Sequence, residues 1–253
     1  MIRSVLAPNP GPFTLDGTRS WLVGETLMID PGPAIDAHVD ALLAAQPRVA
    51  TILLTHRHAD HAPAAVEVAR RTGARILAPA DVLDDAVVSE RLVDGTHIES
   101  EGLVIEAIAT PGHTAEHVCF FTSEGDLFTG DTILGEGTTA IFPPDGVMAD
   151  YMASLRRLRA RYPRAIYPGH GPVRHDAVEW IDYYITHREE REAQILAALA
   201  DGPLGVAELR VRIYPELHPA LRSAAEMQLV AHAKHMADRG LIVPDGARLA
   251  LAT

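Results

Sequence analysis

The sequence is poor in cysteine, in lysine and in long apolar runs. Cys119 is its one cysteine, so no intramolecular disulfide can form, which fits a reducing compartment. No stretch approaches the roughly 20 apolar residues of a membrane helix. Residues 1–8 lack the apolar core of a secretory signal. These absences lead us to expect a cytoplasmic protein that does not enter a membrane.

Positive charge is also scarce. The chain has 22 Lys and Arg residues against 34 Asp and Glu, a formal net charge of −12, and Lys234 is its one lysine. Nucleic-acid surfaces depend on clustered positive charge, so this balance weakens the hypothesis of a nucleic-acid-binding protein. Divalent metal ions would nevertheless add positive charge where a substrate anion binds. A metal enzyme that acts on an anion therefore stays compatible with the composition.

Apolar runs and helical patterns alternate over the first two thirds of the chain. They predict strands at 21–23, 26–29, 49–54, 75–78, 103–109, 118–122, 126–129 and 165–167, and helices at 34–45, 62–72 and 150–161. Pro63 suits the first turn of a helix, and Gly73 suits a helix C-cap. The mixture predicts an α/β sandwich in which helices cover sheets.

The pattern changes after Pro172. Residues 176–200 contain no Gly or Pro and predict one long helix, followed by helices at 206–213 and 219–239 and a short hairpin that ends at Leu251. Two helices followed by a hairpin are typical of a winged-helix module.

The segment from Thr55 to His61 is the most informative part of the sequence. It holds three histidines and one aspartate within six residues, His56, His58, Asp60 and His61, directly after an apolar run. Imidazole and carboxylate are ligands that zinc and similar divalent ions accept. A strand that ends in such a loop would place these ligands on a rigid scaffold.

Three later turns supply further candidate ligands. His113, Asp131 and His170 each follow a predicted strand, and each lies next to a glycine, where the backbone can approach an ion closely. A single histidine in a turn is usually an ordinary surface residue, whereas the joint occurrence in this order is far more specific. Two ions held close together would activate a water and stabilise an oxyanion.

Together these segments resemble the motifs of the metallo-β-lactamase superfamily. The resemblance implies an αββα sandwich and two metal sites: His56, His58 and His113 at one, Asp60, His61 and His170 at the other, with Asp131 bridging them. It also implies catalytic roles for Asp60 and Asp131. Zinc is the usual ion of the family, and these ligands leave iron and manganese open.

Similarity along most of the chain indicates one branch of this superfamily. Segments 9–18, 130–139, 150–155, 167–172 and 184–188 resemble the beta-lactamase-like protein 2 family, whose best-studied animal members are endoribonucleases. The resemblance implies that a metal-bound hydroxide attacks an ester-like bond, first of all a phosphodiester in single-stranded RNA. A thioesterase or lactonase similar to glyoxalase II is the alternative. Asp131, where true β-lactamases have cysteine or serine, argues against more than weak β-lactamase activity.

Substrate contacts are less specific in the sequence. Arg19 and Trp21 depart from the family pattern near the expected mouth of the site, and Arg57 lies within the first motif. His117 is predicted either to line the pocket or to be satisfied by a neighbouring carbonyl, and Thr138 is a further candidate. A small ester-like molecule and single-stranded RNA both remain open as substrates.

We predict three parts: a metal-hydrolase domain at 1–173, a connecting helix at 174–200 and a winged-helix-like domain at 201–253. The second helix of the last part carries few cations, among them Arg222, Lys234 and Arg239, whereas DNA binding requires a basic stripe. We therefore interpret the tail as a packing or dimerisation element, with a homodimer as an open alternative. A non-enzymatic nucleic-acid-binding protein is the competing class, and the full set of metal ligands argues against it.

Overall fold

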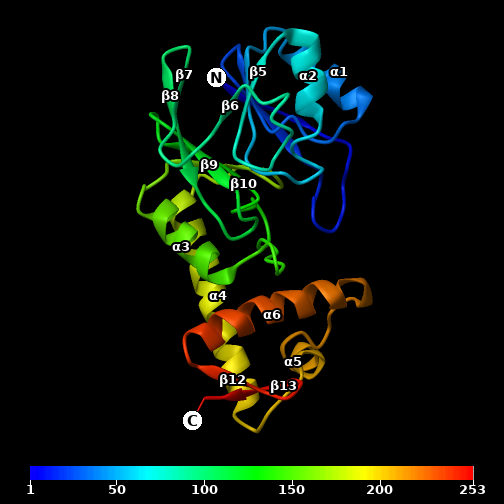
Figure 1. Ribbon diagram of the computed structural model, residues 1–253, viewed down its shortest axis with the longest axis vertical. Coiled ribbons are helices and arrows are strands. Elements are labelled where there is room, and N and C mark those ends of the chain that lie inside the picture. The colour runs from blue at the N-terminus through cyan, green and yellow to red at the C-terminus, as the bar shows by residue number, and fades with distance from the viewer. Residues whose placement is uncertain (253) are drawn as a thin grey trace.

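The computed structural model describes residues 1–252, in which two β-sheets face each other and helices cover their outer sides (Figure 1). The first sheet has its strands in sequence order: β1 (Ile2–Leu6), β2 (Arg19–Val23), β3 (Leu27–Ile29), β4 (Thr51–Leu53), β5 (Arg75–Ala78) and β6 (Glu90–Arg91). The second has the order β11 (Ala165–Pro168), β10 (Asp126–Gly130), β9 (Val118–Thr122), β8 (Leu103–Ala109) and β7 (His97–Ser100). The parallel pairs are β3 to β6 in the first and β10 with β11 in the second.

Apolar side chains of both sheets form a shared core. Leu27 and Leu53 of the first sheet pack in one cluster with Phe120 and Phe128 of the second. On the outer faces, α1 (Asp36–Ala45) and α2 (Ala64–Thr72) cover the first sheet, and α3 (Met148–Arg159) and α4 (Ala177–Leu199) cover the second. Strands buried on both faces read as continuous apolar runs, as in Leu27–Ile29. The predicted αββα sandwich is confirmed.

The predicted elements agree well with the structure where both ends are marked by turns. The bounds of β5, β8 and β9 match, and α2 ends at Gly73, whose left-handed φ of 75° lets its N–H donate to the carbonyl of Ala69. The strands β1, β6 and β7 were not predicted. None of the helices in the described part is both long and apolar enough to span a lipid bilayer.

The C-terminal part has a core of its own. It consists of the end of α4, α5 (Val206–Ile213), a 3-10 turn (Pro219–Leu221), α6 (Arg222–Asp238) and the hairpin of β12 (Ile242–Asp245) and β13 (Arg248–Leu251). Because α4 contributes Tyr184 to the sandwich and Ile195 to this second core, it joins the two parts (Figure 1). The division at 173 and 200 and the winged-helix assignment stay predictions.

Candidate metal centre

The predicted ligands follow the ends of four strands. β4 of the first sheet leads to His56, His58, Asp60 and His61, whereas β8, β10 and β11 of the second lead to His113, Asp131 and His170. The structure places the predicted ligands in two groups, and within each group the ligand atoms lie within 4.8 Å of one another: His56, His58, His113 and Asp131 in the first, and Asp60, His61 and His170 in the second. A third, overlapping group joins His56 and His61 to Asp30. The site therefore lies where both sheets end.

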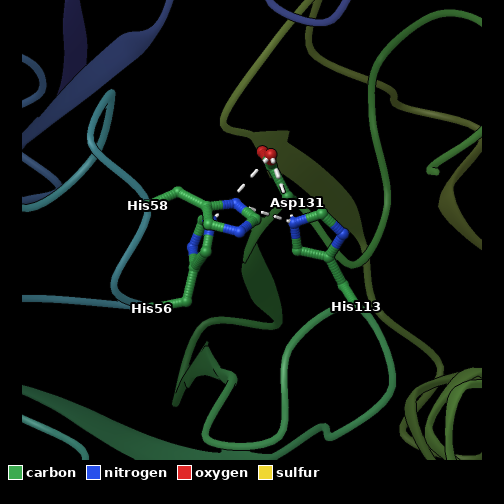
Figure 2. Close-up of side chains that lie close together, drawn as sticks. All are labelled: His56, His58, His113 and Asp131. Atoms are coloured by element: carbon green, nitrogen blue, oxygen red, sulfur yellow. Dashed lines mark hydrogen bonds and ion pairs between the residues drawn. The ribbon is translucent and has the colours of Figure 1, made fainter. Parts of the chain in front are cut away.

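The first group consists of His56, His58, His113 and Asp131 (Figure 2). His113 Nε2 lies 3.1 Å from His58 Nδ1. The carboxylate Oδ2 of Asp131 lies 3.7 Å from His113 Nε2 and 4.0 Å from His56 Nε2. Three imidazoles and one carboxylate oxygen thus converge on one point.

The second group consists of Asp60, His61 and His170. His170 Nε2 lies 3.2 Å from Asp60 Oδ2 and 3.3 Å from His61 Nε2. Asp131 presents its other oxygen here, because Oδ1 lies 3.2 Å from His61 Nε2 and 3.3 Å from His170 Nε2. One carboxylate between two groups is the geometry that a bridging ligand requires, and the bridging role itself stays a prediction.

The polar atoms at the centre fit divalent ions better than they fit one another. Ligands about 2.0 Å from a tetrahedral ion lie roughly 3.3 Å apart, close to the spacings between the facing ring nitrogens. His56 Nε2 and Asp131 Oδ1 are buried without a hydrogen-bond partner in the described chain. The nitrogens nearest to Oδ1 are Nε2 of His61 at 3.2 Å and Nε2 of His170 at 3.3 Å. Buried atoms of this kind are costly unless a ligand satisfies them.

The outer nitrogens of four imidazoles are held by the protein itself. Nδ1 of His56 contacts Thr55 Oγ1 at 2.9 Å, and Nδ1 of His61 contacts Asp30 Oδ2 at 3.0 Å. Nδ1 of His113 and of His170 face the carbonyls of Ala140 and Gly17 at 3.0 Å and 3.1 Å. A donor N–H at Nδ1 leaves Nε2 free for an ion, as in metal sites where outer partners fix the tautomer.

The pKa shifts of the histidines differ between the two groups. Burial, followed by the charges of His61 and His117, holds the pKa of His56 well below its usual range. At His170 burial acts in the same direction, but Asp131 and Asp60 outweigh it and raise its pKa to about 9. Burial would raise the pKa of Asp60, but the hydrogen bond from His170 and the charge of His61 outweigh it and lower this pKa to about 2. An ion at the second group must therefore displace protons, so its affinity falls as the pH falls.

Asp30 is a functional residue that the sequence reasoning missed. It follows β3 with a positive φ of 46°, and its carboxylate accepts hydrogen bonds from the N–H and hydroxyl of Thr55 at 2.8 Å and 2.6 Å. The same carboxylate contacts His61. Asp30 thus orients ligands of both groups, and its place at a strand end before Pro31 and Gly32 is the only sequence signal for it.

Asp30→Asn tests this orienting role. We expect metal affinity and kcat to fall about 10- to 100-fold, because the amide offers Thr55 and His61 only one acceptor oxygen. Titration of the apoprotein with Zn²⁺ and steady-state kinetics would measure both. Asp40→Asn is the control, since Asp40 forms an exposed ion pair with Arg71 and belongs to neither ligand group. Equal losses in both variants would contradict the assigned role.

The other predicted residues lie in several surroundings. The guanidinium of Arg19 donates to the carbonyl of Gly171 and pairs with Asp16. Trp21 is buried between the sheets and donates to the carbonyl of Pro168. Arg57 is exposed and pairs with Glu116 and Asp145. None of the three lines the cavity over the centre, and their contact with substrate stays a prediction.

His117 and Thr138 lie closer to the chemistry. His117 is buried beside the first group, where its Nε2 accepts from the N–H of Asp131 at 3.3 Å and its Nδ1 faces the hydroxyl of Thr110 at 3.0 Å. It therefore holds the backbone of Asp131, and hydroxyl groups rather than a carbonyl satisfy its side chain. Thr138 lines the cavity.

A cavity of about 490 Å³ opens over both groups. Several of the predicted ligands form part of its lining: His58, Asp60, His113, Asp131 and His170. Its other walls are mainly apolar or hydroxyl-bearing, with Glu136 as an acidic side chain among them, and come from residues 12–15, 134, 136–140 and 142. This arrangement can hold a small substrate against two metal ions.

Two known proteins are similar to this chain in sequence. The beta-lactamase-like protein 2 homolog of Caenorhabditis elegans is 34% identical over 239 residues, which are 88% of this chain and 80% of that protein. An atrochrysone carboxyl ACP thioesterase of Aspergillus fumigatus is 37% identical over 207 residues, which are 77% of this chain and 64% of that protein.

Two solved structures extend the comparison. A metallo-beta-lactamase family protein of Thermus thermophilus superposes with a TM-score of 0.79 at 23% identity over 99% of this chain and 98% of that one. A protein solved in a di-iron-bound form superposes with a TM-score of 0.55 at 25% identity over 70% of this chain and 96% of that one. The model of the metallo-beta-lactamase superfamily matches residues 13–170. The chain therefore belongs to the metallo-beta-lactamase superfamily, whose members are metal-dependent hydrolases.

Proposed function

We propose that the chain is a two-metal hydrolase that cleaves an acyl ester or thioester. The observation that carries this proposal is the position of the two ligand groups, which meet at Asp131 on the floor of a largely apolar cavity. Zinc is the expected ion. Iron is the alternative, which the similarity to a protein solved with two iron ions supports.

The residues around the centre have separate roles in this proposal. Bound ions would activate a water and stabilise the negative charge that develops on the substrate. Asp60 lines the cavity beside His170, and its carboxylate can accept the proton of the attacking water. Phe13, Leu134 and Phe142 line the same cavity and would exclude bulk water and receive an apolar acyl group. The similarity to a fungal ACP thioesterase supports this substrate class.

Single-stranded RNA is the second candidate substrate, and it stays a prediction from the sequence resemblance. Phe13 favours it, because this ring is 55% exposed at the cavity and could stack on a base. Proteins that bind single strands combine such rings with a positively charged groove. The lining of the main cavity contains no lysine or arginine among the described residues, so the acyl substrate is the better fit.

Parallel assays of a hexanoyl thioester, an aliphatic lactone and a single-stranded RNA oligonucleotide would test the proposal. We expect metal-dependent hydrolysis of the thioester that falls on the order of 10²- to 10³-fold in Asp60→Ala, because a group that acts in the transition state is lost. Asp40→Ala, which removes an exposed carboxylate, should keep wild-type activity. Cleavage of RNA alone, with the same dependence on Asp60, would establish the second candidate. Activity that survives in Asp60→Ala would contradict both.

A further inference from the structure

A second cavity, of about 220 Å³, adjoins the one over the metal centre. The two share five lining residues, which are Phe13, Phe142 and the segment from Thr138 to Ala140. The other side of the second cavity is formed by α4, by α6 and by residues 214–221 between α5 and α6. The two cavities therefore lie side by side, one over the metal centre and the other against the helices of the C-terminal part.

The second cavity differs from the first in its charge. Arg188 and Arg191 line it, together with His187 and Gln228. None of its described lining residues is an aspartate or glutamate, although the chain has 34 acidic residues and a net charge of −12. A positively charged cavity in an acidic protein indicates that it binds an anion.

Arg188 places a buried positive charge at this cavity. Its side chain is fully buried, with a relative exposure of 2% for the residue, and no carboxylate of the described chain lies within 4.0 Å of its guanidinium. It donates to the carbonyl of Thr139 and lies 5.4 Å from the ring centre of Tyr151, while its Nε has no hydrogen-bond partner. A buried charge without a counter-charge is strongly unfavourable. The structure leaves that counter-charge to a ligand.

Arg191 and Gln228 line the same cavity, and each has a buried donor without a hydrogen-bond partner in the described chain. The guanidinium of Arg191 lies 4.3 Å from the ring centre of Tyr214 and donates to Gln194, but its buried Nε has no partner. Gln228 uses its oxygen to accept the N–H of Ile141 at 2.8 Å, which leaves its Nε2 unpaired. Arg188 and Arg191 belong to α4, whereas Gln228 belongs to α6. The cavity is therefore lined by donor residues from two helices and not by the surface of one.

Other arginines of this chain form ion pairs with carboxylates, which Arg188 and Arg191 do not within residues 1–252. Five arginines in and after α3 each contact a carboxylate: Arg156 with Glu189, Arg157 with Asp94, Arg159 with Asp182, Arg161 with Glu106 and Arg164 with Asp126. Their charges are paired within the protein. Arg188 differs from them in both burial and partners, and Arg191 differs from them in partners.

We propose that the second cavity is an anion subsite that receives a carboxylate or phosphate group of the substrate, remote from the bond that is cut. The proposal rests on the proposed hydrolase function and adds a requirement to the substrate: an ester-like bond at one end and an acidic group at the other. Arg188 and Arg191 supply the charge, and Gln228 supplies a neutral donor.

Matched thioesters would test the subsite. One pair has acyl chains that end in a carboxylate or in its amide, and a second pair ends in a phosphate or in a hydroxyl group. For the metal-loaded wild type we expect KM to be about tenfold lower for the acidic member of at least one pair, and the pair that shows it identifies the group. Arg191→Gln should remove most of that preference. Arg174→Gln is the matched control, because Arg174 also stacks on a ring, that of Trp180 at 3.8 Å, but lies outside the cavity.

A binding measurement separates the subsite from the proposed function. Calorimetry would measure the binding of glutarate and of inorganic phosphate. For at least one of these anions we expect a binding component that Arg191→Gln loses and Arg174→Gln keeps. This result does not require that any of the thioesters is hydrolysed. Absence of hydrolysis together with this component would overturn the proposed function and keep the subsite. Equal KM values within both pairs, or a preference and binding component that survive in Arg191→Gln, would overturn the subsite.

Discussion

Replacement of Asp131 by alanine is expected to lower kcat/KM on the order of 10³-fold and to reduce the metal content to one ion or none per chain. Asp131 directs Oδ2 towards His56 and His113 and Oδ1 towards His61 and His170. Its loss would remove the carboxylate that faces both groups, and with it the negative charge that would let two cations lie close together. Metal analysis of the purified variant and its kinetics on the same substrate would measure the two effects.

A control in the same cavity makes this result specific. Glu136 also lines the cavity but belongs to neither ligand group, so Glu136→Gln should keep its full metal content. If Asp131→Ala retained two ions and wild-type kcat/KM, the bridging role and the two-metal mechanism would both be wrong. If it retained two ions but lost activity, Asp131 would act on the water or substrate and not as a required ligand.

The strands that the sequence could predict are those with local boundaries. β8 and β9 are apolar runs that end at glycine-containing or polar turns, so their limits follow from nearby residues. β1 has the mixed burial of a sheet edge and carries Arg3 and Ser4, and β6 is only two residues long. Pairing with a distant strand, as in Ile2 with Val23, stabilises β1, and a local pattern cannot reveal that partner.

The metal ligands could be predicted because their chemistry is carried by residue type and by adjacent glycines. Most of the groups that orient the imidazoles could not, because they come from distant segments; Thr55, the neighbour of His56, is the exception. The carbonyl of Gly17 faces His170 across 153 positions, and that of Ala140 faces His113 across 27. A backbone carbonyl leaves no trace in the sequence, whereas Asp30, 31 positions from His61, leaves only a weak one.

The expected substrate contacts show a different limit. Trp21 and Arg19 lie on β2, whose end reaches the site, but the face of the sheet on which a strand residue lies is not determined by its residue type. Trp21 enters the core between the sheets, where its ring packs edge to face against Tyr167 at 5.1 Å. The anion subsite was not predicted either, because Arg188 and Gln228 meet only when α4 and α6 pack against the segment from Thr138 to Phe142. The direction of the side chains and the packing of distant segments determine these contacts, and residue type does not reveal either.

Gly169→Ala is expected to disrupt the metal centre through one methyl group. A Cβ at this position would lie 2.6 Å from His61 Cε1 and 2.8 Å from Asp131 Oδ1, well inside van der Waals contact. Neither neighbour can move freely, because Asp30 holds His61 and the N–H of Asp131 donates to His117. Gly169 itself is fixed, since its N–H donates to Gly130 and its carbonyl accepts from Arg19.

We expect this variant to lose about 1–3 kcal/mol of unfolding free energy to overpacking and to lose activity on the order of 10²-fold or more, because both ligand groups are displaced. Thermal unfolding, metal content and kcat would be measured together. Gly205→Ala is the matched control, since its Cβ would approach only Glu208 at an ordinary 3.4 Å. Loss of stability with unchanged metal content would place the strain in the backbone at Pro168 and His170, whereas loss of metal at nearly unchanged stability would show that ligand geometry alone limits this site.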